Sequence, residues 1–92
     1  MKIIVQYETQ ARRAAGVGSE TVEVSEGATV AQVVRQLAAS HGDPLRAILL
    51  DDAAEIQPTL LLFVSDEQID RDGSTALSDG DSLTIMTPIS GG

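Results

Sequence analysis

The amino-terminal part of the chain contains two runs in which apolar and polar residues alternate. In residues 2–8, Ile3, Val5 and Tyr7 share one face of an extended chain, and Ile4 lies among polar residues on the other. Residues 19–25 (SETVEVS) place Val22 and Val24 on one face in the same way. Between them, "TQARRAAGVG" breaks the pattern, which predicts a loop with at most one helical turn. Two strands forming a hairpin are therefore expected.

After Gly27 the period changes from that of a strand to that of a helix. Thr29 and Gln32 have the spacing of a capping box, which predicts that a helix begins here. Gly42 is expected to end this helix in a left-handed conformation. One buried stripe at helical spacing comprises Val30, Val33, Val34, Leu37 and Ala38.

The middle of the chain combines a short helical pattern with a longer apolar run. Asp43 as a cap and Pro44 at the first helical position predict a short helix, which would turn Leu45, Ile48 and Leu49 inward. Residues 59–65 (TLLLFVS) are apolar on both faces, which is typical of a central strand or one covered on both sides.

The remaining residues predict a short edge strand, two turns and a last strand. The edge strand falls at residues 67–69, and the turns are "RDGS" and "SDGDS". In the last strand, residues 82–88, Leu83 and Ile85 face inward and Pro88 ends the strand.

This order of elements predicts an α+β fold with one main helix on one face of a mixed four- to five-stranded sheet. The first and last strands can then lie side by side in the middle, which is the β-grasp (ubiquitin-like) arrangement. We expect a single domain over residues 1–88, followed by a flexible diglycine tail at residues 89–92.

Composition excludes several classes of function. The net charge of −8 disfavours nucleic acid and anionic membranes as partners and suits a protein with a basic docking face. The alternative is that the acidic residues only keep a small protein soluble. The sequence has no cysteine, so any sulfur chemistry cannot pass through a side-chain thiol. No stretch predicts a membrane span or a signal peptide, which makes the cytoplasm the expected location.

The remaining polar residues do not form a convincing active site. Asp70, Asp72, Gly73 and Asp79 loosely follow a calcium loop, but Gln68 replaces its first carboxylate and no flanking helices are predicted. Two acidic turns are the better interpretation. His41 is the only histidine and falls at a helix end, where it can meet the helix dipole. We therefore expect no bound metal or cofactor, and a carrier or substrate rather than an enzyme.

Three segments together resemble the ubiquitin-like sulfur-carrier family: the helix "TVAQVVRQLAASHG", the turn and strand "LSDGDSLTIMTP", and the closing "GG". That family includes the molybdopterin synthase small subunit, the thiamine sulfur carrier and the carrier used in protein-bound cysteine synthesis. The resemblance covers most of the chain and is weakest over residues 43–58. Many members have alanine before the diglycine, where this chain has Ser90.

The resemblance implies chemistry at the Gly92 carboxylate. In the family, an E1-like activating enzyme uses ATP to adenylate the terminal carboxylate, and a sulfur donor then converts the glycyl adenylate to a thiocarboxylate (1-thioglycine). A sulfur-accepting synthase receives the sulfur for cofactor, cysteine or secondary-metabolite synthesis. Gly91 and Gly92 lack side chains, so they could thread a narrow channel to the nucleotide.

A docking surface is expected to accompany the tail. Phe63 and Met86 point away from the inward residues of their strands, so they would form an exposed apolar patch for the activating enzyme. The alternative is that residues 44–56 fold over and bury them. Pro88, Ile89 and Ser90, which join the strand to the diglycine, are the further predicted contacts with the partner.

Two other functions fit the same sequence. A protein modifier would join Gly92 to a lysine through an isopeptide bond, and would give branched lysine adducts in place of a thiocarboxylate. A non-covalent β-grasp binding module would keep its activity after Gly91 and Gly92 are deleted.

Overall fold

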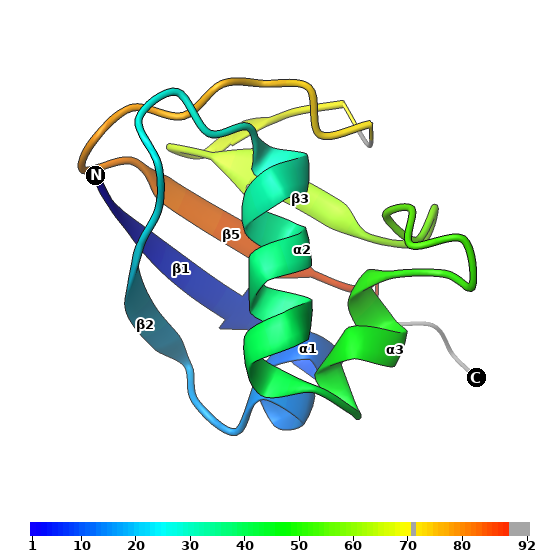
Figure 1. Ribbon diagram of the computed structural model, residues 1–92. Helices are drawn as coiled ribbons and strands as arrows, with labels where there is room; N and C mark the ends of the chain where they lie inside the picture. The colour runs from blue at the N-terminus through cyan, green and yellow to red at the C-terminus, as the bar shows by residue number, and fades with distance from the viewer. Residues whose placement is uncertain (71, 89–92) are drawn as a thin grey trace.

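The computed structural model describes residues 1–70 and 72–88. Within them the chain forms a single five-stranded sheet with the main helix packed across one face (Figure 1). Along the chain the elements are β1 (Lys2–Glu8), α1 (Thr9–Ala15), β2 (Ser19–Glu23), α2 (Val30–His41), α3 (Leu45–Leu49), β3 (Leu61–Val64), β4 (Glu67–Gln68) and β5 (Ser82–Met86).

The strand order is β2-β1-β5-β3-β4, with the first and last strands of the chain paired in the middle. The β1–β5 pair is parallel, and the β1–β2, β3–β5 and β3–β4 pairs are antiparallel. This mixed sheet confirms the predicted arrangement. The predicted tail, residues 89–92, lies outside the described residues.

The core lies between α2 and the sheet. The predicted inward residues of β1 and β5 are fully buried, and so is most of the α2 stripe. The largest fully buried side chains are Tyr7, Ile3, Leu37, Leu45, Leu49, Leu60, Leu62, Leu83, Ile85, Val5, Val30 and Val33.

The beginning of α2 has a partner for each of its first N–H groups. Thr29 forms the predicted capping box with Gln32. The Val30 N–H donates to the Thr75 carbonyl at 2.9 Å, and the Ala31 N–H donates to the Gly73 carbonyl at 2.9 Å. Residues 73–75 therefore cross the helix N-terminus and satisfy donors that a helix leaves unpaired.

The structure corrects the prediction of a loop with at most one helical turn, because all of residues 9–15 form helix α1. Its sequence, TQARRAA, is rich in good helix formers but too short to show a periodic apolar stripe. Gly16 ends the helix in the left-handed conformation, with φ 78° and ψ 1°.

The junction between α2 and α3 also differs from the prediction. Gly42 has a positive φ of 67° but a ψ of −161°, so it is not a left-handed cap. Its N–H closes the last turn of α2 on Ala38, and its carbonyl accepts the Arg46 N–H at 2.9 Å, which begins α3. Pro44 occupies the N-cap position without a side-chain cap, so Asp43 is not the cap and Pro44 is not the first helical residue.

The apolar strand β3 is not covered on both faces. Leu60 and Leu62 are buried against the helices, whereas Leu61 and Phe63 remain partly exposed on the other side. β3 pairs with β5 on one side and with the two-residue β4 on the other. The strand is apolar on both faces although only one face is buried in the core.

Candidate functional site

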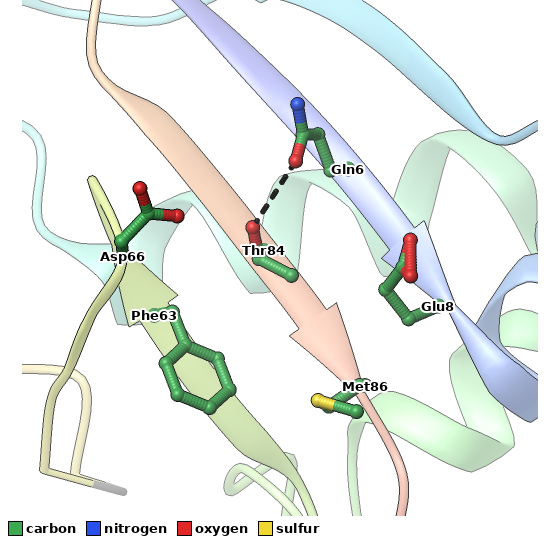
Figure 2. A pocket seen from close by; sticks show the side chains of 6 residues that line it. All are labelled: Gln6, Glu8, Phe63, Asp66, Thr84 and Met86. Carbon is green, nitrogen blue, oxygen red and sulfur yellow. Dashed lines mark hydrogen bonds between the residues drawn. The ribbon is translucent and has the colours of Figure 1, made fainter.

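The predicted docking residues Phe63 and Met86 lie together on the open face of the sheet. Phe63 pairs with Thr84 across the β3–β5 ladder, and Leu61 pairs with Met86. Phe63 and Met86 are therefore diagonal neighbours, close enough for long side chains to touch. Figure 2 shows them pointing from this face, with the helices behind the sheet.

These two side chains line a shallow hollow of about 370 Å³, together with Gln6, Glu8, Asp66 and Thr84 (Figure 2). The Thr84 hydroxyl donates to the Gln6 side-chain oxygen at 3.4 Å. Carboxylates at Glu8 and Asp66 stand on either side of the apolar pair. An apolar centre with an acidic rim is complementary to an apolar surface bordered by Lys or Arg.

Residues 44–56 do not cover this hollow. Leu45, Leu49, Leu50 and Ile56 belong to the core, and α3 packs with α1 and α2. Phe63 and Met86 are nevertheless half-buried by their neighbours rather than fully exposed. The structure thus favours the open-face interpretation over the covered one.

Sequence reasoning did not include Ile4 in the docking patch. Ile4 lies on β1 on the same face as Gln6 and Glu8, and 40% of its surface is exposed. The signal was present in the alternation of residues 2–8, which placed Ile4 opposite the inward side chains. We name Ile4, Phe63 and Met86 the open-face residues.

The predicted residues that follow β5 are only partly within the described chain. Pro88 is described and exposed. Ile89, Ser90, Gly91 and Gly92 lie outside the described residues. The structure therefore gives no geometry for the Gly92 carboxylate, and β5 and Pro88 show only where the chain leaves the sheet.

A second hollow is lined by Arg12, Arg13, Gly16, Val17 and Gly18, at the end of α1. Val17 is 44% exposed, and the Arg12 guanidinium lies over Gly18. Within residues 1–70 and 72–88 neither arginine forms an ion pair. Their charges thus face solvent in an otherwise acidic protein.

Sequence reasoning also missed a partly buried polar cluster of Tyr7, Glu20 and His41. The Tyr7 hydroxyl donates to a Glu20 carboxylate oxygen at 2.6 Å, and His41 Nε2 lies 2.6 Å from the same oxygen. The Tyr7 and His41 rings meet edge to face, with centroids 5.9 Å apart. No local pattern could have found it, because the three residues lie on β1, β2 and the end of α2.

The cluster changes the titration of two of its members. Burial and the Glu20 carboxylate raise the pKa of the Tyr7 hydroxyl. Burial also disfavours the charged form of Glu20, but hydrogen bonds from Tyr7 and His41 and the charge of His41 outweigh it and lower the Glu20 pKa. The cluster thus ties the end of α2 to the sheet, a more specific role than the predicted dipole contact of His41.

The acidic residues that loosely follow a calcium loop make turns. The Asp70 carbonyl accepts the Gly73 N–H at 3.1 Å. An Asp72 carboxylate oxygen accepts the Ser74 N–H at 3.0 Å, which lowers the pKa of Asp72. Asp79 accepts the Lys2 N–H at 2.7 Å. Among the described residues no three His, Asp or Glu side chains are grouped to hold a metal ion.

The described helices include none with the length and apolar composition that would let it cross a membrane.

The fold places the protein in a structural class. A mixed sheet with parallel first and last strands in its centre and one main helix across one face is the β-grasp, ubiquitin-like fold. A crystal structure of SAMP1 from Haloferax volcanii superposes on the chain with a TM-score of 0.89 over 100% of both chains, at 23% identity.

Sequence comparison identifies the family within that class. The ThiS family profile matches residues 5–92. The chain is 32% identical to a molybdopterin synthase sulfur carrier subunit from Chlamydomonas reinhardtii over 92 residues, which is 100% of both chains. It is 33% identical to small archaeal modifier protein 3 from Haloferax volcanii over 94 residues, again 100% of both. The chain belongs to the ThiS family, whose relatives here are a sulfur carrier and a protein modifier.

Proposed function

We propose that this protein carries sulfur as a thiocarboxylate at Gly92. The observation that supports this most strongly is the full-length match to a molybdopterin synthase sulfur carrier subunit. The absence of cysteine in the sequence agrees with it, because a thiocarboxylate holds sulfur without a side-chain thiol.

The proposed chemistry has two steps at the Gly92 carboxyl group. A Gly92 carboxylate oxygen attacks the α-phosphorus of ATP on an E1-like enzyme, and pyrophosphate leaves. A donor of sulfide-level sulfur then attacks the acyl carbon, and AMP leaves with the electrons of the carbon–oxygen bond. The product is the thiocarboxylate. This chain is the substrate in both steps, and the partner enzyme supplies the catalytic groups.

The open-face residues are the proposed docking site for that enzyme. Phe63 and Met86 lie on β3 and β5, and Met86 is two residues before Pro88. A partner that contacts Met86 therefore also meets the point where the chain leaves the sheet. The tail residues Ile89 and Ser90 are proposed to continue this contact, with Gly91 and Gly92 in the active site of the enzyme.

The test is intact mass spectrometry of the chain produced together with its E1-like enzyme and a sulfur source. We expect one oxygen of Gly92 to be replaced by sulfur. Phe63→Asp should abolish the exchange without unfolding the domain, since the side chain is half-buried and outside the core. Ser25→Asp is the matched control, because it adds the same charge to an exposed turn residue beyond the end of β2, away from the open-face residues. An unmodified wild-type chain would contradict the proposal.

A protein modifier is the second candidate, favoured by the match to small archaeal modifier protein 3. Both functions need activation of Gly92, and they differ in the product. If the protein is a modifier, mass spectrometry of digested cell extract should find branched lysine peptides that carry the carboxyl-terminal residues of this chain. Sulfur exchange without such adducts would contradict the modifier.

A further inference from the structure

The parallel ladder between β1 and β5 ends abruptly at the pair Glu8 and Met86. The next residues in register are Thr9 and Thr87. Thr9 has a φ of 54°, in the left-handed region, so its backbone cannot continue the extended strand. A β-branched residue is rare in this conformation, and here it begins α1.

The side chain of Thr9 replaces the missing backbone contacts. Its Oγ1 accepts the Thr87 N–H at 3.1 Å and lies 2.7 Å from the Thr87 carbonyl oxygen. The two hydroxyl oxygens are 3.0 Å apart. The Glu8 carbonyl, also at 2.7 Å, competes for the single hydroxyl proton of Thr9. One hydroxyl thus contacts the N–H, the carbonyl and the side chain of Thr87.

Thr87 is bound by these contacts although it lies outside a strand. Its polar side chain is only 7% exposed. Pro88 follows it and has no N–H to bond back to the sheet. Thr87 is therefore where the described fold fixes the chain before the carboxyl-terminal segment. From there, five residues reach at most about 17 Å.

We propose that Thr9 is a positioning residue for the reaction at Gly92. By fixing Thr87, its hydroxyl sets the point and direction in which the carboxyl-terminal segment leaves the sheet. Glycine would adopt the same backbone conformation without strain but would lack the hydroxyl. A strained threonine at this place is explained by the contacts of its side chain. The inference rests on the proposed function.

The first experiment measures the kinetics with which the E1-like enzyme of the same organism adenylates the chain. ATP is the second substrate, and pyrophosphate release is the readout. Thr9→Gly and Thr9→Ala both remove the hydroxyl, but only the glycine removes the backbone strain. We expect both to lower kcat by about ten- to a hundredfold, because small misplacements of a reacting group cost this much. KM should stay unchanged, since the open-face residues are intact. Thr9→Ser keeps the hydroxyl and should restore kcat.

The second experiment measures hydrogen exchange of the Thr87 amide. Exchange should be faster in Thr9→Gly than in the wild type and in Thr9→Ser, whereas the Val5 amide in the sheet should stay protected in all three. A Thr9→Gly variant with wild-type kcat, or with a protected Thr87 amide, would overturn the role of Thr9. A kcat loss in Thr9→Ala alone would also overturn it, because strain would then be the cause. A wild-type chain that is not adenylated would instead overturn the proposed function.

Discussion

Replacing Gly73 by alanine should destabilise the fold by about 3–5 kcal/mol. Gly73 is buried where residues 73–75 cross the start of α2, and its φ is 68°. A Cβ added there would lie 2.7 Å from the Ala31 backbone nitrogen and 2.8 Å from the Ile56 Cδ1. Backbone cannot yield as a flexible side chain can, so the crossing segment must move away from the helix.

The magnitude combines three effects of the same methyl group. An L-residue in the left-handed conformation costs about 1 kcal/mol relative to glycine. Overpacking costs roughly 1–3 kcal/mol. Moving the segment also weakens the hydrogen bond from the Ala31 N–H to the Gly73 carbonyl, worth about 1 kcal/mol. With a urea m-value of about 2 kcal/mol/M, the unfolding midpoint should fall by about 2 M.

Urea unfolding monitored by the fluorescence of Tyr7 measures this change, since the sequence has one tyrosine and no tryptophan. Gly80→Ala is the matched control, because Gly80 has a φ of 86° and no atom within 4 Å of an added Cβ. It should cost only the same backbone term of about 1 kcal/mol. Equal losses in the two variants would refute the proposed close approach at Gly73.

Two further predictions concern the Tyr7–Glu20–His41 cluster. The lowered pKa of Glu20 contributes stability that is present above its ordinary value of 4.5 and is lost as the pH falls below that value. On acidification, the free energy of unfolding should therefore fall less steeply in Glu20→Gln than in the wild type. Superimposable pH profiles of the two proteins would contradict this. The raised pKa of Tyr7 contributes stability that is present below its ordinary value of 10.0 and is lost at higher pH. Absorbance titration should therefore show Tyr7 ionising only together with alkaline unfolding. Ionisation of Tyr7 near pH 10 in the folded protein would contradict this.

The sequence was informative where local pattern and tertiary packing agree. The stripe of α2, its Thr29–Gln32 capping box and the alternation of β1 each predict a side chain that the structure buries or bonds. The acidic turn before β5 could also be predicted, because Asp-Gly pairs strongly favour turns. Together these elements were enough to predict the β-grasp arrangement.

The features that were missed depend on contacts between distant residues. Helix α1 begins at Thr9 in a conformation that threonine disfavours, without a side-chain cap, and is held by the hydroxyl contacts to Thr87. The Tyr7–Glu20 hydrogen bond joins residues 13 apart, and the Glu20–His41 contact joins residues 21 apart. Propensity and periodicity carry no information about such pairs. For the candidate site, sequence placed Phe63 and Met86 on one face, but the hollow and the contribution of Ile4 required the sheet order.

The pairing of β1 with β5 has a consequence for protein synthesis. A ribosome makes β1 first and β5 last, so β1 cannot pair with its central neighbour until residues 82–86 have emerged. Nascent chains that stall before that point lack the middle strand of the sheet and remain open to proteases. Completion of the sheet is thus coupled to translation of residues 82–86.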